Sequence, residues 1–153
     1  MMQSIPLLDK VAKGSLYAVV FLLPLWFLPL TQNVLVYQKQ ALLVLLVFLG
    51  LVAWLAKVVN QGEIRLRISF LYIPVGVLLL GIGISTLLSR WAFASFWGWP
   101  LNLSDNFLTV AVFALFSFLI FQVVEDPKHL FRLLLVLLVS SGIAVLYTLL
   151  QVY

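Results

Sequence analysis

The stretch Ala41-Leu-Leu-Val-Leu-Leu-Val-Phe48 decides the fold class of this chain. It is apolar at every position, whereas a strand of a membrane barrel alternates apolar and polar side chains over ~10 residues. The surrounding segment from Gln40 to Ala56 contains no charged side chain. Its length lies within the range of a helix that crosses a membrane at ~1.5 Å per residue. The stretch therefore predicts a transmembrane helix.

Four further segments of the chain share this composition. None of them contains Asp, Glu, Lys, Arg or His, and a helix is the form that satisfies all backbone hydrogen bonds of a single segment inside a membrane. We therefore predict an all-α fold, a polytopic transmembrane bundle of about five helices in a single region, residues 1–153. The predicted helices cover residues 14–30, 40–56, 68–89, 106–124 and 133–153.

The overall composition excludes a soluble domain. Hydrophobic residues make up 65% of the chain and charged residues 9%, whereas a soluble domain is near half apolar and about a quarter charged. So few charges could not cover an apolar core with a polar surface. We expect membrane lipids to supply the outer shell, and we expect no nucleic-acid partner, because the net charge of +4 is not gathered on a soluble face.

The basic residues divide unequally between the two sides of the predicted bundle. Lys and Arg concentrate in short cytoplasmic loops. One side would hold only Lys39 and Arg90, and this side is therefore predicted to be the outer one. The other side, with the N-terminus, is predicted to be cytoplasmic, and it would hold Lys10, Lys13, Lys57, Arg65, Arg67, Lys128 and Arg132.

The last predicted helix reaches the outer face at Tyr153 and has no polar tail after it. Five crossings from a cytoplasmic N-terminus place Tyr153 on that face. We therefore expect the chain to be the N-terminal part of a longer membrane protein.

The sequence offers little chemistry for catalysis or metal binding. It has no cysteine and a single histidine, His129, with no second imidazole to complete a metal site. We expect no metal, no cofactor and no catalytic residue. Two pairs of small residues, Gly81 with Ser85 and Ser140 with Ala144, are spaced so that neighbouring helices could approach closely.

The predicted outer loop, residues 88–105, is rich in aromatic residues. It contains three of the five tryptophans, together with two phenylalanines and Arg90. One interpretation is an aromatic belt at the lipid headgroups. The other is a site for a lipid-linked glycan, with rings stacked on sugars and Arg90 bound to phosphate. Lys39 allows the same two interpretations, because its ammonium group could reach the interface or bind a diphosphate.

Several short motifs follow the predicted helices in order. They are Gln38-Lys39-Gln40, Trp54, Arg65-Leu-Arg67-Ile-Ser, Ser85-Thr-Leu-Leu-Ser89 and Ser95-Phe-Trp-Gly98. Over residues 16 to 125 this arrangement resembles the N-terminal portion of bacterial O-antigen ligases and of the related O-antigen polymerases.

That resemblance implies a metal-independent glycosyltransferase of lipopolysaccharide biosynthesis in the bacterial inner membrane. Such an enzyme transfers a glycan from undecaprenyl diphosphate to an outer-leaflet acceptor such as lipid A-core. Its essential basic residues lie in a large periplasmic loop of the C-terminal half, beyond Tyr153. The resemblance therefore implies no catalytic residue here. The matching positions would be contacts to the carrier or parts of the scaffold, and they are Lys39, Arg90, Ser95 and Gly98.

The alternative function is a small non-enzymatic membrane scaffold or transporter subunit. Such a protein would associate with other chains through its small-residue faces. Reading beyond Tyr153 would separate the two, because the ligase interpretation predicts more helices and a long outer loop rich in Arg and His.

Overall fold

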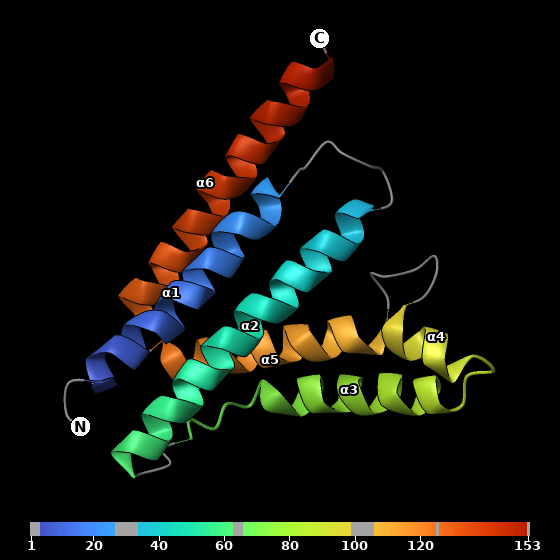
Figure 1. The fold of residues 1–153 in the computed structure, drawn as a ribbon, viewed down its shortest axis with the longest axis horizontal. Helices are drawn as coiled ribbons and strands as arrows, with labels where there is room; N and C mark the ends of the chain where they lie inside the picture. The colour runs from blue at the N-terminus through green and yellow to red at the C-terminus, as the bar shows by residue number, and fades with distance from the viewer. Residues whose placement is uncertain (1–3, 27–33, 63–65, 99–105, 125, 153) are drawn as a thin grey trace.

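The computed structural model describes residues 4–26, 34–62, 66–98, 106–124 and 126–152. Within these residues the only regular secondary structure is helical, which confirms the predicted all-α fold class. The helices are α1 (Ser4–Leu25), α2 (Val34–Gln61), α3 (Tyr72–Leu87), α4 (Ala92–Trp97), α5 (Phe107–Val123) and α6 (Pro127–Val152) (Figure 1).

Two of the described helices are long and apolar enough to cross a membrane. The apolar stretch covers Gln38–Gln61 in α2 and Pro127–Leu150 in α6. Helices α3 and α5 are also apolar, but they have 16 and 17 residues. At ~1.5 Å per residue each is about 25 Å long, which is less than the ~30 Å of hydrocarbon. The described residues thus contain two full-length candidate spans, fewer than the five predicted.

Helix α1 extends further toward the N-terminus than predicted. It begins at Ser4, whereas the sequence predicts a helix from Gly14, and it therefore includes Asp9, Lys10 and Lys13. A charged residue marks the edge of a hydrocarbon layer, because a charge is costly inside it. It does not mark the end of a helix, which can continue in a polar environment.

Helix α3 begins at Tyr72, so residues 68–71 lie outside it although they open the predicted third span. Pro74 explains this start. In a helix that began earlier, the proline ring would clash with the carbonyl group of Phe70, four residues before it. A turn precedes the helix instead, and Tyr72 N donates to Ser69 O at 3.0 Å.

Neighbouring helices are antiparallel in two pairs. In the first pair, Asp9 near the start of α1 contacts Lys57 near the end of α2. In the second, Tyr72 at the start of α3 bonds to Gln122 near the end of α5. Helix α1 packs against both α2 and α6, and α5 packs against α1, α2, α3 and α4. Figure 1 shows that α1, α2 and α6 follow one general direction, whereas α3 and α5 lie across them.

One of the two predicted small-residue contacts is present. Ser140 and Ala144 of α6 are buried, and Ser140 Oγ donates to Val20 O of α1 at 3.3 Å. The other pair, Gly81 with Ser85, makes no such contact among the described residues. A Cβ atom added to Gly81 would have no neighbour within 4 Å, and Ser85 is exposed. The spacing of small residues predicts close packing only where a second helix covers that face.

Helices α1 and α2 approach closely at Gly50, a glycine that the sequence did not single out. A Cβ atom added to Gly50 would lie 2.5 Å from Ser15 Oγ and 3.4 Å from Leu119 Cδ1. Ser15 is buried, and its hydroxyl group donates to Ala12 O at 2.8 Å. The backbone of α2 can therefore lie this close to α1 because Gly50 has no side chain.

The side chains are arranged as expected for a protein in an apolar solvent. Large apolar residues on α2, α3 and α6 face outward, and Val59, Leu87 and Leu150 are 79%, 81% and 78% exposed. Soluble proteins rarely expose apolar surface on this scale. Several polar residues are buried instead: Ser15, Thr86, Asn106, Thr109, Gln122 and Ser140. The apolar core between α1, α2 and α5 comprises Ala12, Leu16, Val19, Leu43, Val47, Ala53, Trp54, Val112, Leu119 and Val123.

Candidate functional site

The short helix α4 lies in the segment that connects α3 with α5, and a pair of serines fixes its start. Ser89 Oγ accepts hydrogen bonds from Trp91 N at 3.3 Å and from Ser95 Oγ at 2.8 Å. The Ser95 hydroxyl group therefore ties the first turn of α4 to the end of α3. This contact gives Ser95, one of the predicted site residues, a structural role.

Gly98 directly follows the last residue of α4 and forms its C-terminal cap. Its φ is +77°, in the left-handed region that favours glycine, and its N–H donates to Ala94 O at 2.7 Å. Gly98 is also buried. This second predicted site residue is thus required by the backbone conformation at the end of α4.

A chain of side-chain hydrogen bonds connects α4, α5 and α2. Asn106 Nδ2 donates to Trp97 O at 3.1 Å, and Asn106 Oδ1 accepts from Thr109 N at 2.7 Å, which caps α5. Thr109 Oγ1 in turn accepts from Gln40 Nε2 at 3.0 Å. Asn106 and Thr109 are buried. The sequence did not single out these two residues, because a polar residue beside an apolar run gives no sign of its partner.

The two basic residues predicted to contact the carrier, Lys39 and Arg90, lie in different parts of the structure. Lys39 precedes Gln40 on α2 and is half-buried, whereas Arg90 is exposed in the turn before α4. The hydrogen bond from Gln40 to Thr109 brings the Lys39 region to the start of α5. The structure thus places Ser95 on α4 and Gly98 at its C-terminal cap. It connects α4 through Asn106 and Thr109 to the part of α2 that carries Lys39.

Aromatic rings cover the outside of α4. Trp91, Phe93 and Trp97 are 77%, 72% and 51% exposed. The ring of Phe96 lies 5.6 Å from that of Trp97 and stacks on Phe107 of α5 at 5.5 Å. The ring of Phe93 lies 6.4 Å from that of Trp97. Phe93, Phe96 and Trp97 of the predicted aromatic loop therefore form one surface, which we call the α4 aromatic surface. Trp99 of the same loop lies outside the described residues.

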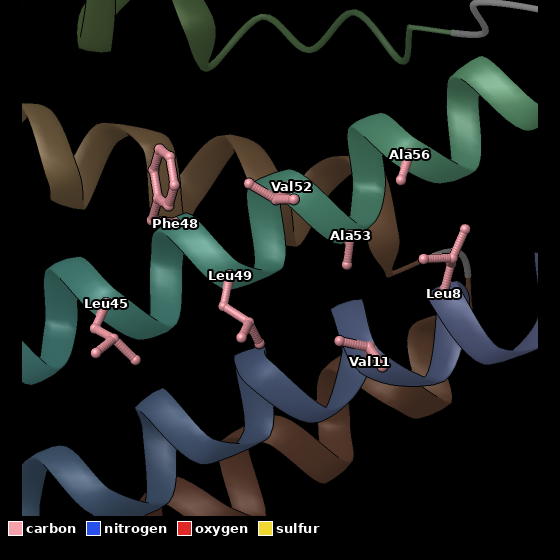
Figure 2. Close-up of a pocket in the computed structure, with 8 residues that line it drawn as sticks. All are labelled: Leu8, Val11, Leu45, Phe48, Leu49, Val52, Ala53 and Ala56. Carbon is pink, nitrogen blue, oxygen red and sulfur yellow. The ribbon is translucent and has the colours of Figure 1, made fainter.

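A groove of about 450 Å³ lies between α1 and α2. Figure 2 shows that Leu49 and Ala53 of α2 point toward α1. A binding site usually adds a few polar groups that orient its ligand, and every side chain that lines this groove is apolar. The groove therefore lacks groups for recognition or catalysis; its lining is Leu8, Val11, Leu45, Phe48, Leu49, Val52, Ala53 and Ala56.

Where the start of α1 meets the end of α2, Asp9 bridges two lysines. Its carboxylate lies 2.6 Å from Lys13 Nζ and 2.5 Å from Lys57 Nζ. Burial raises the pKa of Asp9, but the two ammonium groups lower it further, so the net pKa lies below its ordinary value. The carboxylate therefore remains ionised between the two cations, and it joins the start of α1 to the end of α2.

Gln122 of α5 fixes the chain before α3. Its Oε1 accepts from Arg67 N at 3.2 Å, and its Nε2 donates to Arg67 O at 3.2 Å and to Tyr72 Oη at 3.1 Å. The side chain of Gln122 is buried. One carboxamide thus satisfies both backbone polar groups of a residue that is not in a helix. The sequence did not predict this contact, because the partners are 55 positions apart.

The described residues contain no group of three or more His, Cys, Asp or Glu that could hold a metal ion. Comparison of the chain with protein-family models, curated proteins and solved structures finds no match.

Proposed function

We propose that this chain is a multi-pass protein of the bacterial inner membrane, with five crossings and a cytoplasmic N-terminus. The exposed apolar faces of α2, α3 and α6 support this proposal, since a bilayer would cover them. The antiparallel pairs α1–α2 and α3–α5 also support it, because successive crossings alternate in direction. Helices somewhat shorter than the hydrocarbon are accommodated by local thinning and by flanking residues.

Two basic residues from other parts of the chain lie near opposite ends of α5, and this supports the orientation. Gln40, next to Lys39, bonds to Thr109 near the start of α5, whereas Arg67 bonds to Gln122 near its end. These two contacts lie about 20 Å apart along a helix that rises ~1.5 Å per residue. Arg67 and Lys39 therefore belong to opposite ends, as the predicted topology requires.

A labelling experiment tests the topology. The chain has no cysteine, so Arg90→Cys and Gln61→Cys each create a single reactive thiol at an exposed position. An impermeant thiol reagent added to intact cells should label the first variant and not the second until the cells are opened. Labelling of both from outside, or the reverse order, would contradict the proposed orientation.

We further propose that the end of the molecule around α4 contacts a glycan on a diphosphate-linked lipid, and that the chain is the N-terminal part of a glycan ligase or polymerase. The observation that carries this proposal is the hydrogen-bond chain from Trp97 through Asn106 and Thr109 to Gln40. It connects the exposed rings of α4, by way of α5, to the part of α2 that carries Lys39. Aromatic rings suit the apolar faces of sugars, and a cation suits a diphosphate.

Binding to the carrier tests this function. In nanodiscs, Lys39→Ala and Arg90→Ala should each weaken binding of undecaprenyl diphosphate-linked glycan about tenfold, because a hydrogen bond to a charged group contributes about 1.5–3 kcal/mol. Lys128→Ala, an exposed lysine at the start of α6, is the matched control and should bind as the parent chain does. Equal affinity of all four proteins would contradict the proposed contact.

A membrane scaffold is the second candidate function, and the outward position of Gly81 and Ser85 on α3 favours it. Small residues on an exposed face allow another helix to approach closely. The binding experiment separates the two functions, because a scaffold predicts no glycan affinity that depends on Lys39 or Arg90.

A further inference from the structure

The segment of residues 66–71, between α2 and α3, presents large apolar side chains outside any helix. Ile68 is 91% exposed and Phe70 is 82% exposed. Leu66 and Leu71, at the two ends of the segment, are 53% and 52% exposed. We call this segment the pre-α3 segment. A bulky side chain exposed to this degree gains free energy from any apolar surroundings that cover it.

The pre-α3 segment is held in one position by groups from α3 and α5. The Gln122 carboxamide accepts from the N–H of Arg67 and donates to its C=O, and it also donates to Tyr72 Oη. Arg67 Nη1 also donates to Val124 O at 3.4 Å. Backbone that is not helical is tolerated at membrane depth only when such partners satisfy it. These contacts satisfy both backbone polar groups of Arg67. In the turn that leads into α3, Ser69 O and Phe70 O accept from Tyr72 N and Ile73 N.

The pre-α3 segment lies at one end of an apolar helix, where the surface of a membrane would be expected. It directly precedes α3, whose 16 residues span about 24 Å at ~1.5 Å per residue and fall short of the ~30 Å hydrocarbon layer. Four more apolar or small residues, Ile68–Leu71, extend the apolar stretch at this end. Arg67 then marks the polar boundary.

We propose that Ile68 and Phe70 insert into the boundary between headgroups and acyl chains of an anionic leaflet, with Arg67 at the level of the lipid phosphates. This inference rests on the proposed membrane location, and it adds a lipid contact surface that lies outside any helix. Charge favours lipid as the occupant. Lys57 and Lys13 share one carboxylate, that of Asp9, at the same end of the molecule, so this group has a positive net charge. Such charge attracts an anionic leaflet.

Depth-dependent quenching tests the inference on the whole chain. Ile68→Cys and Phe70→Cys are each labelled with an environment-sensitive fluorophore and reconstituted into phosphatidylglycerol-containing vesicles. Leu45→Cys, on the exposed apolar face of α2, reports deep lipid contact, and Asn60→Cys, at the exposed end of α2, reports water. Lipids that carry bromine near the headgroup should quench the labels at 68 and 70 at least twofold more than the label at 60. Iodide in the water should quench the labels at 68 and 70 less than the label at 60.

The outcomes separate this inference from the proposed membrane location. If iodide quenches the labels at 68 and 70 as strongly as the label at 60, while lipid quenches the label at 45, the pre-α3 segment faces water and the inference is overturned. If the label at 45 is not quenched by lipid either, the membrane location itself fails. Ser69→Cys provides a further check, because Ser69 is less exposed than its two neighbours and its label should be quenched less by lipid.

Discussion

Replacing the buried Gly50 with leucine should separate α1 from α2 and destabilise the bundle. A Cβ atom alone would lie 2.5 Å from Ser15 Oγ, and the longer side chain would also meet Leu119 of α5. Overpacking of this kind costs about 1–3 kcal/mol and sometimes more. We expect Gly50→Leu to lower the free energy of unfolding, measured by circular dichroism in mixed micelles titrated with dodecyl sulfate, by about 3 kcal/mol.

Two comparisons make the Gly50 result specific. Gly81→Leu introduces the same side chain at a helical glycine with open space around it and should change the free energy of unfolding by less than about 0.5 kcal/mol. Gly50→Ala should cost less than Gly50→Leu, because Ser15 Oγ can rotate away and give up its bond to Ala12 O. Adding Ser15→Ala should then recover most of that loss. Equal effects at Gly50 and Gly81 would refute the close approach of α1 and α2.

Replacing Gln122 with methionine should free the pre-α3 segment. Methionine has nearly the same length, but it leaves the N–H and C=O of Arg67 without their partner and removes the bond to Tyr72 Oη. A buried polar group left unpaired costs about 1–3 kcal/mol. Because the bonds to Arg67 are partly buried, we expect a loss of about 1–2 kcal/mol in the free energy of unfolding. The amide hydrogen of Arg67 should also exchange at least tenfold faster.

The same substitution at an exposed glutamine provides the control. Gln61→Met, at the end of α2, removes an exposed carboxamide and should alter neither the stability nor the exchange rate of Arg67. If Gln122→Met and Gln61→Met behave alike in both measurements, the carboxamide of Gln122 does not hold the pre-α3 segment.

The helical fold class could be predicted because it depends only on the local pattern of apolar residues. A run such as Ala41–Phe48, apolar at every position, excludes the alternation of a membrane strand. The ends of the helices were less predictable. The sequence placed the start of α1 after Lys13, where charge ends, whereas the helix continues back to Ser4. It also placed the start of α3 too early, although Pro74 limits how far that helix can extend.

The candidate site could be predicted only in part. Gly98 and Ser95 lie in one short motif, and the structure places Ser95 on α4 and Gly98 at the C-terminal cap of the same helix. The connection from Asn106 to Thr109 and Gln40 depends on which helices lie side by side. That arrangement is set by packing between helices, and the local sequence does not contain it. For the same reason, the outward position of Gly81 could not be distinguished from the buried position of Ser140.

The contact between α6 and α1 has a consequence for the order of assembly. Ser140 and Val20 are 120 positions apart, whereas α1 and α2 follow one another along the chain. During synthesis the α1–α2 hairpin can form early, because it closes over a short separation. The face of α1 that receives Ser140 must wait until α6 has emerged from the ribosome. Until then this face of α1 is uncovered. An insertase or chaperone would have to bind it during this interval.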